Sequence, residues 1–342
     1  MADDKIRIGI LGAGAMGTAH AAVYADIVDV EVVGVFARDL QRARSAAALC
    51  KAEPFTDADA LIRHPAVDAI DVCLPSAVHH DFVIPALDQG KHVFCESPLA
   101  LRLADARRML EAARRADRLL QVGLLMRSVS AYEHVKAVAT SGEHGRLLSL
   151  ATWRLGSYLR PGAPDHKAHY SDPSTELMTF DFDFVQWLMG PPARLSASAT
   201  RTAQGGPGEI SAILDYDDGR QATVVASGLM PRGFPFSVGF RVLFEDAAFE
   251  LQTVFEGGPP RSNFTVVSDN APPRGVVTPG RNPYQVELQR FADCIRGRAD
   301  PGLLDAERAI EALALSIATQ RALQGSGIRY QGSDSIGSFS DP

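Results

Sequence analysis

The stretch Lys5-Ile-Arg-Ile-Gly-Ile-Leu-Gly12-Ala-Gly14-Ala-Met-Gly17 runs from an apolar segment into a G-x-G-x-x-G turn and then into a helix-forming segment. In a strand–turn–helix unit of this kind, Gly12 permits the tight turn, Gly14 lets backbone N–H groups approach a pyrophosphate, and Gly17 lets helix and strand pack closely. The start of the helix adds unpaired N–H donors and a partial positive charge. The sequence therefore predicts a dinucleotide site here, with an ordinary strand-to-helix turn as the alternative. The predicted cofactor contacts of this turn are Gly12, Gly14, Ala15, Met16 and Gly17.

The end of the next apolar segment, Val30–Phe36, indicates which dinucleotide binds. NAD-selective sites place an Asp or Glu at this point, where it binds the ribose 2′-hydroxyl. This chain has Ala37 followed by Arg38, so no carboxylate repels a 2′-phosphate and a guanidinium is present to pair with it. Asp39 is expected to cap the following helix. The pattern favours NADP(H), and the alternative is that Arg38 is a solvated surface residue.

Apolar segments and helical segments alternate through the first part of the chain, which predicts an α/β fold with a doubly wound parallel sheet over residues 1–124. Ligands bind beyond the carboxyl ends of the strands in such sheets. The turns expected to line that crevice are Leu74–Ser76, Glu96–Pro98 and Leu124–Arg127.

Residues 125–330 read differently, as successive strands with few helices between them, and they predict a second, α+β domain with an open, mostly antiparallel sheet. Its helices are expected at about 174–189, 283–297 and 304–324, the last two packing partly on the first domain. Loops are expected at 160–173, 201–208 and 256–282. Residues 331–342 have the composition of a disordered tail.

Composition limits the function classes. The 342-residue chain is 46% hydrophobic and 22% charged, as is usual for a soluble globular protein, and its net charge of −7 argues against nucleic-acid or anionic-membrane surfaces. The four cysteines are dispersed without a C-x-x-C pair or a His partner at metal spacing. The acidic N-terminus does not resemble a signal peptide. We therefore expect a cytoplasmic protein without a metal, a membrane partner or a nucleic-acid partner.

Several spaced motifs together resemble the Gfo/Idh/MocA oxidoreductases (glucose–fructose oxidoreductase, inositol dehydrogenase and rhizopine catabolism proteins) over about residues 5–328. Besides the glycine turn, the motifs are Asp71-Val-Cys-Leu-Pro75-Ser-Ala-Val-His79, Ala86–Ala100 with Glu96-Ser-Pro98, Gln121-Val-Gly123 with Arg127, Asp183–Gly190, and Pro283-Tyr284-Gln-Val-Glu287.

The resemblance implies that Leu74, Pro75 and His79 lie beside the cofactor, that Glu96 approaches the nicotinamide ribose, and that Tyr284 closes over the cofactor. It also implies hydride transfer at a hydroxyl-bearing carbon of a sugar, cyclitol or derivative, and a homodimer or homotetramer formed through the open sheet.

The chain departs from the family pattern at the proton-transfer positions. The family's Glu-Lys-Pro is Glu96-Ser97-Pro98 here, and serine is a poor base that carries no positive charge. The family's downstream acidic-x-x-x-His pair becomes Glu176 and Phe180, so the carboxylate is kept and the histidine is lost.

Other residues are candidates to replace the missing groups. The loop 160–170 before the Glu176 helix carries several titratable side chains, although each of them is also a plausible surface residue. Trp153 and Arg154 are neighbours on a strand, so one of them faces the crevice and the other the opposite side. The candidate catalytic residues are Ser97, Glu176, Asp181, Lys167 and Tyr170. The candidate substrate-binding residues are Arg127, Trp153, Arg154, His166, His169 and Phe180.

The sequence thus predicts an NADP-dependent oxidoreductase that acts on a sugar-, cyclitol- or lactol-like small molecule. A lactol hydroxyl is more acidic than a secondary alcohol and needs a weaker base. Two alternatives are an NADP(H)-sensing regulator without turnover, and non-redox chemistry on glycosides with a retained cofactor.

Overall fold

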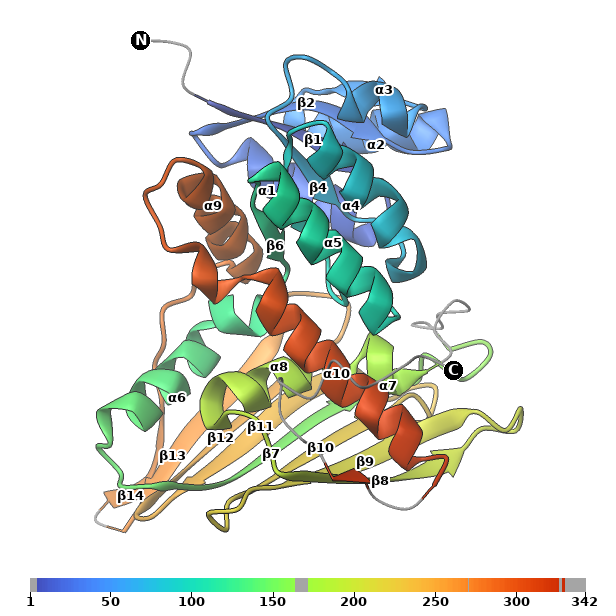
Figure 1. The fold of residues 1–342 in the computed structure, drawn as a ribbon. Helices are drawn as coiled ribbons and strands as arrows, with labels where there is room; N and C mark the ends of the chain where they lie inside the picture. The colour runs from blue at the N-terminus through green and yellow to red at the C-terminus, as the bar shows by residue number, and fades with distance from the viewer. Residues whose placement is uncertain (1–4, 164–171, 270, 326–327, 330–342) are drawn as a thin grey trace. The chain divides into compact units, whose positions relative to one another are not determined.

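The computed structural model describes residues 5–163, 172–269, 271–325 and 328–329. These residues belong to two compact units. The first unit comprises the chain up to Val129 together with Arg281–Ile310, and the second comprises Ser130–Gly280 together with the chain from Glu311. Figure 1 shows the elements of both units along the chain. None of the helices in the described ranges is both long and apolar enough to cross a membrane.

The first unit contains a parallel sheet of six described strands in the order β3-β2-β1-β4-β5-β6. The chain builds outward from β1 through β2 to β3, and then returns to the other side of β1 with β4. The strand order therefore reverses between β1 and β4, which is where an open α/β sheet binds its ligand. The strands are β1 (Ile6–Leu11), β2 (Val30–Phe36), β3 (Glu53–Phe55), β4 (Ala69–Val72), β5 (His92–Cys95) and β6 (Leu120–Val122).

Helices connect these strands, as the predicted doubly wound sheet requires. Helix α1 packs against α2, α4 packs against α5, and α9 from the later part of the chain packs against α1. The helical segments are α1 (Ala15–Ala25), α2 (Leu40–Cys50), α3 (Ala58–Ile62), η1 (Ser76–Val78), α4 (His79–Asp88), α5 (Leu103–Ala116), η2 (Leu125–Ser128), α9 (Pro283–Ile295) and η3 (Pro301–Leu303). The predicted parallel α/β architecture is confirmed.

The second unit contains a sheet of nine described strands in the order β14-β13-β12-β11-β7-β10-β9-β8-β15. Every neighbouring pair is antiparallel except β7 and β10, which confirms the predicted, mostly antiparallel sheet. The strands are β7 (Leu147–Leu155), β8 (Arg194–Arg201), β9 (Pro207–Asp215), β10 (Gln221–Ser227), β11 (Phe236–Phe244), β12 (Ala247–Phe255), β13 (Arg261–Ser268), β14 (Ala271–Gly275) and β15 (Ile328–Arg329).

Helices of the second unit cover one face of this sheet, where α8 packs on β7 and β10 and α6 packs on α8 (Figure 1). The helices are α6 (Ser130–Ser141), α7 (Pro173–Glu176), α8 (Met178–Met189) and α10 (Ala306–Ala322). Helix α10 begins in the residues of the first unit and continues into those of the second.

Three details of the sequence prediction were wrong. The expected loop 256–282 contains β13 and β14, and in β13 only Phe264 and Val266 are buried, so its apolar pattern is weak. The expected helix at about 174–189 is interrupted at Leu177, between α7 and α8. Neither helix α6 nor strand β12 was predicted. The expected disordered tail lies outside the described residues.

Candidate functional site

The glycine turn after β1 has a steric reason for two of its three glycines. Gly12 has φ +118°, and a Cβ there would lie 2.5 Å from the carbonyl oxygen of Cys73. A Cβ on Gly17 would lie 1.8 Å from the carbonyl oxygen of Gly12, so α1 approaches the turn more closely than any side chain allows. Around Gly14, the residue preceding α1, no heavy atom lies within 4 Å of a Cβ position. Gly12 and Gly17 thus serve packing, whereas the space at Gly14 is open for a ligand.

The end of β2 presents a cation and no available carboxylate. Ala37 is buried, and Arg38 is exposed with no hydrogen bond or ion pair to another described residue. The side chain of Asp39 accepts hydrogen bonds from the backbone N–H groups of Gln41 at 2.8 Å and Arg42 at 3.1 Å. Asp39 is therefore the N-cap of α2, as the sequence predicted.

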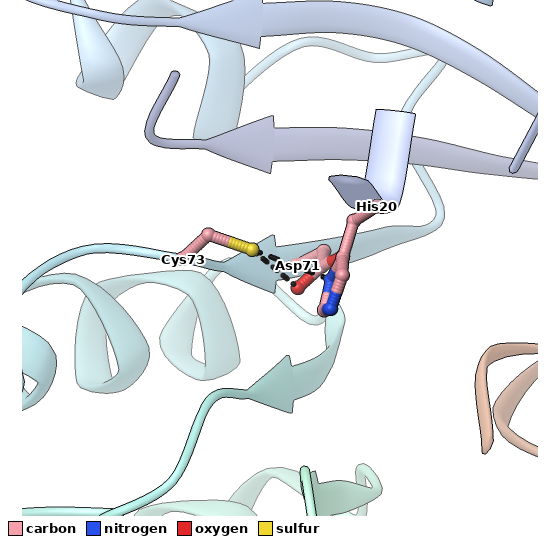
Figure 2. A group of neighbouring side chains, drawn as sticks. All are labelled: His20, Asp71 and Cys73. Carbon is pink, nitrogen blue, oxygen red and sulfur yellow. Dashed lines mark hydrogen bonds and ion pairs between the residues drawn. The ribbon is translucent and has the colours of Figure 1, made fainter. Parts of the chain in front are cut away.

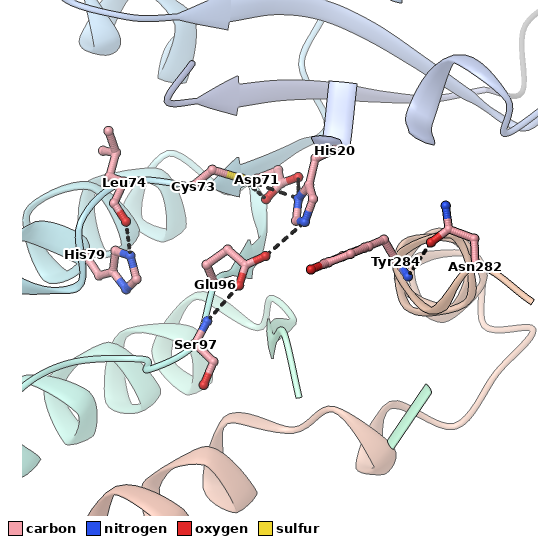
Figure 3. A network of polar contacts seen from close by, with 9 residues as sticks. All are labelled: His20, Asp71, Cys73, Leu74, His79, Glu96, Ser97, Asn282 and Tyr284. Carbon is pink, nitrogen blue, oxygen red and sulfur yellow. Dashed lines mark hydrogen bonds and ion pairs between the residues drawn. The ribbon is translucent and has the colours of Figure 1, made fainter. Parts of the chain in front are cut away.

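The turn after β4 is held by a buried histidine. His79 Nε2 lies 2.7 Å from the carbonyl oxygen of Leu74, while its Nδ1 lies 3.1 Å from the carbonyl oxygen of Leu99 and 3.2 Å from Cys95 Sγ. Burial lowers the pKa of His79, which favours the neutral ring, whose one N–H donates to one of the two carbonyl oxygens that the ring nitrogens face. His79 thus braces the Leu74–Pro75 turn through its backbone (Figure 3).

A network of buried charged groups lies beneath this turn, centred on His20 of α1 (Figure 2). His20 Nδ1 lies 2.8 Å from Asp71 Oδ2, and its Nε2 lies 2.9 Å from Glu96 Oε1. Neither His20 nor Asp71 is exposed. The imidazole therefore bridges two carboxylates that come from β4 and from the end of β5.

The charge state of His20 follows from these neighbours. Burial alone would lower its pKa, but attraction to Cys73 and Asp71, and hydrogen bonds to them, raise the pKa well above its usual value. Burial also raises the pKa of the Cys73 thiol, which stays protonated. The negative charge facing His20 therefore comes from Asp71 and Glu96, whose oxygens lie 2.8 and 2.9 Å from its two ring nitrogens and favour the imidazolium form.

Glu96 is fixed on two sides. Its Oε2 accepts the backbone N–H of Ser97 at 3.1 Å, and its Oε1 faces His20 (Figure 3). A Cβ on Gly123 would lie 3.1 Å from Glu96 Oε2, so the glycine leaves room for the carboxylate. The Tyr284 ring, from the first turn of α9, lies 5.9 Å from the His20 ring and points toward Glu96 (Figure 3). The structure thus brings Glu96, Ser97 and Tyr284 together.

Glu287, one turn further along α9, is also buried beside this network. Burial and the charge of Glu96 raise its pKa well above its usual value, which favours the protonated carboxyl group. His20 lies within metal-ligand spacing of Glu96 and Glu287, and separately of Asp71 and Cys73. A metal there would have to displace a proton from the imidazole, which the adjacent carboxylates help to hold.

A second cluster lies in the second unit, where β7 meets α8. Arg154 Nε donates to Asp181 Oδ2 at 2.7 Å, and the Arg154 guanidinium lies over the Phe180 ring at 4.9 Å. Arg154 and Asp181 are both buried, and Arg154 Nη2 has no hydrogen-bond partner among the described residues. Burial raises the pKa of Asp181, although Arg154 opposes that effect. The structure therefore brings together Arg154, Phe180 and Asp181.

Glu176, at the end of α7, has a shifted pKa. Burial, and next the negative charge of Asp172, raise its pKa from 4.5 to about 7. Asp172 is itself fixed as the N-cap of α7, where it accepts hydrogen bonds from Ser174, and it also accepts one from Gln320. A carboxyl group that titrates near neutrality can both accept and donate a proton at working pH.

The remaining predicted residues are placed as follows. Trp153 lies on the sheet face opposite Arg154, where its ring covers Gly239 on the neighbouring strand, as the predicted alternation requires. Arg127 is buried and donates to the carbonyl oxygen of Leu303 at 3.0 Å. The candidates His166, Lys167, His169 and Tyr170 lie outside the described residues.

Sequence reasoning did not single out His20, Asp71 or Glu287. A signal was present, because Asp71 is a charged residue in the middle of the otherwise apolar strand β4, and burial of an unpaired charge is costly. His20 follows Gly17 on the helix face that the glycine brings against the sheet.

Comparison with known families matches both units. Residues 6–124 match the model of an oxidoreductase family with an NAD-binding Rossmann fold, GFO/IDH/MocA, and residues 132–250 match the GFO/IDH/MocA C-terminal domain.

Individual proteins match as well. Inositol 2-dehydrogenase 4 of Saccharopolyspora erythraea is 30% identical over 349 residues, which cover 96% of each chain. The inositol 2-dehydrogenase of Acidothermus cellulolyticus is 33% identical over 212 residues, a match that spans only 60% of that relative's length. The scyllo-inositol 2-dehydrogenase (NAD(+)) of Bacillus subtilis is 24% identical over 90% of this chain and 91% of that protein.

Among solved structures, a putative NADPH-dependent oxidoreductase from Desulfitobacterium hafniense has the same fold, with a TM-score of 0.84 and 17% identity over 95% of this chain and 98% of that one.

Proposed function

This chain belongs to the Gfo/Idh/MocA oxidoreductase family, and from that premise we propose that it is an NADP-dependent oxidoreductase. It moves hydride between the cofactor and a hydroxyl-bearing carbon of a sugar, cyclitol or lactol. The observation that carries the proposal is the joint presence of an open dinucleotide turn and of Glu176, a carboxyl group whose pKa is about 7.

The described residues of the first unit fit a dinucleotide. The open space at Gly14 and the N-terminus of α1 would hold the pyrophosphate, and the turn at Leu74 and Pro75, braced by His79, borders the same end of the sheet. When bound, the nicotinamide supplies the site that accepts or gives up hydride.

The preference for NADP rests on the end of β2. Arg38 is free to pair with a 2′-phosphate, and Asp39, the nearest carboxylate, is engaged as a helix cap. The Bacillus subtilis relative is named for NAD(+), so the two proteins would differ in this preference.

We propose Glu176 as the group that takes the hydroxyl proton when substrate is oxidised and returns it in the reverse reaction. Above pH 7 its carboxylate is the base, and below pH 7 its carboxylic acid is the donor. Ser97 takes the place of the family lysine with a hydroxyl that can donate a hydrogen bond but supplies no charge. Its Oγ is buried without a hydrogen-bond partner among the described residues.

Substrate hydroxyls need donors and an apolar surface. Asp181 orients the guanidinium of Arg154, whose buried Nη2 has no hydrogen-bond partner among the described residues, and Phe180 provides a ring face. Inositol 2-dehydrogenases among the relatives make cyclitols the first class to test.

The proposal includes assembly of two or four copies through the sheet of the second unit. Several of the large apolar side chains on its strands are at least 39% exposed, namely Ile213, Leu243, Phe255 and Val267.

The test is NADP⁺ reduction, followed at 340 nm, by purified protein first shown to bind NADPH. The panel contains inositols, hexoses with their lactol forms, and alditols, each also offered with NAD⁺. We expect NADPH formation with at least one class, and faster turnover with NADP⁺ than with NAD⁺. A protein that binds NADPH but reduces no cofactor with any class would contradict the proposal and favour a sensor or a non-redox role.

A further inference from the structure

We propose that His20 is a positioning residue for the cofactor site. Its imidazolium, anchored by Asp71, holds the Glu96 carboxylate in the orientation from which Glu96 accepts a hydrogen bond from a hydroxyl of the nicotinamide ribose. This inference rests on the proposed function, because it takes the ligand to be NADP(H).

The geometry shows a chain of contacts that ends at Glu96. Asp71 lies in the middle of a buried strand, and its Oδ2 fixes His20 Nδ1 at 2.8 Å. That contact sets the plane of the ring and brings Nε2 to 2.9 Å from Glu96 Oε1 (Figure 3). The side chains of Asp71 and His20 are fully buried, whereas that of Glu96 is 13% exposed, the most of the three.

The contact between His20 and Glu96 leaves Glu96 able to accept another hydrogen bond. The two atoms are at ion-pair distance, but neither His20 Nε2 nor Glu96 Oε1 has an aligned hydrogen-bond partner among the described residues. Glu96 Oε2 accepts a hydrogen bond from the N–H of Ser97. Oε1 is itself buried against His20, but a carboxylate oxygen has two lone pairs, so Oε2 can accept a ligand hydroxyl besides the N–H of Ser97.

The surroundings explain why a cation is needed here. Two carboxylates and a buried carboxyl group converge on one site, and without a positive charge Asp71 and Glu96 would repel each other in a poorly solvated environment. The titratable groups that face His20 from the elements packed around it are Tyr24 of α1, Asp71 and Cys73 at β4, Glu96 after β5, and Tyr284 and Glu287 of α9. His20 is the only basic side chain in that group.

Position in the fold connects this chain of contacts to the ligand. Asp71 belongs to β4 and Glu96 follows β5, while His20 is in α1, the helix whose N-terminus borders the glycine turn. The strand order reverses between β1 and β4, and Glu96 directly follows β5, the neighbour of β4, so it lies at the carboxyl edge of the sheet, where ligands bind. The contacts from Asp71 through His20 to Glu96 thus link the buried strand β4 to that edge.

Two substitutions separate the two contacts of His20. In H20N the shorter amide can still reach Asp71 but not Glu96, and in H20Q the longer amide can reach Glu96 as a neutral donor. We expect H20N to raise the NADPH dissociation constant at least about tenfold, and H20Q to raise it less, about threefold. Binding is measured by NADPH fluorescence, with thermal denaturation of each variant as the check on folding.

The control ligand is adenosine 2′,5′-bisphosphate, which carries the adenine end and the 2′-phosphate but no nicotinamide ribose. Its affinity should be unchanged in both variants. The double variant H20N/E96Q should bind NADPH no more weakly than E96Q alone, because the role of His20 is exerted through Glu96.

The outcomes are distinct. Equal losses for NADPH and for the bisphosphate, or NADPH affinities in H20N and H20Q that equal the wild-type value, would overturn the role of His20 and leave NADP binding established. Wild-type protein that binds neither ligand would overturn the proposed function and the inference with it.

Discussion

The glycine turn of the first unit and the Arg154–Phe180 cluster of the second obey different physical rules. At the turn, space decides Gly12 and Gly17, because a Cβ on either would lie within 2.5 Å of a backbone carbonyl oxygen. In the second unit the surroundings decide the chemistry, since burial and Asp172 turn Glu176 into a group that titrates near pH 7. Steric requirements are local in sequence and restrict residue type, whereas electrostatic ones arise from residues brought together by the fold.

The difference between steric and electrostatic requirements predicts which positions can change as members of this family diverge. The glycine turn has all three glycines of the G-x-G-x-x-G pattern, whereas Ser97 and Phe180 stand where the resemblance to the family leads us to expect a lysine and a histidine. Phe180 now supports Arg154 through its ring face. A proton-transfer group can be replaced wherever burial shifts another pKa, but no other residue replaces a glycine whose Cβ would meet the backbone.

The largest effect is expected from R154M, which leaves Asp181 buried without its partner. We expect a loss of about 4 kcal/mol in the free energy of unfolding at neutral pH. Asp181 can then avoid its buried charge by taking up a proton, so the loss should shrink as pH falls. Urea denaturation at several pH values measures this, and R154M/D181L should recover most of the stability. A loss below about 1 kcal/mol at every pH would show that the surroundings tolerate the lone carboxylate.

Substitution of Gly17, where an added Cβ would lie 1.8 Å from the carbonyl oxygen of Gly12, tests the steric requirement. G17A should cost about 3 kcal/mol or more, because α1 must move away from the turn. G14A is the matched control, since its Cβ meets nothing within 4 Å. It should keep the wild-type melting temperature while weakening NADPH binding. If G17A melted at the wild-type temperature, the close approach of helix and turn would not constrain this position.

Cofactor choice is tested by R38A, which should raise the NADPH dissociation constant roughly tenfold through loss of a charged hydrogen bond to the 2′-phosphate. The NADH dissociation constant should stay the same. R63A is the control, because Arg63 is an exposed arginine paired with Asp59 on α3. Equal losses for both cofactors in R38A would remove the basis for NADP preference.

The smallest effect is expected from D39A, which deletes the N-cap of α2. The cost should be about 1 kcal/mol of stability, with D39N largely restoring it. The ratio of NADPH to NADH affinity should not change. A selective fall in NADH affinity would mean that Asp39 binds the ribose 2′-hydroxyl, and the cofactor assignment would then be reversed.

Much of the fold could be predicted because its signals are local. Apolar runs followed by glycine turns gave the parallel sheet, and alternation gave most strands of the second unit. Strand β13 was missed because only Phe264 and Val266 of its eight residues are buried, which is too weak a pattern to separate from a loop. The break at Leu177 has no sequence signal that we could identify.

The contacts of the functional residues also differ in whether the sequence could predict them. The cap at Asp39 and the opposite facing of Trp153 and Arg154 follow from short-range geometry and were predictable. The pairing of Arg154 with Asp181 joins residues 27 positions apart, and the contacts of His20 with Asp71 and Glu96 join three separate elements. In a single sequence, such residues are recognisable only as charged side chains at positions where the pattern predicts apolar ones.

The proposed role of Glu176 in proton transfer is tested most directly by the pH dependence of substrate oxidation at saturating NADP⁺. We predict that kcat/KM of the wild-type enzyme rises with pH through an apparent pKa near 7, as Glu176 loses its proton. In E176Q that rise should disappear, and the rate above pH 7 should fall about 100-fold. An E176Q enzyme that keeps the same pH-dependent rise would contradict the account and place the proton acceptor elsewhere.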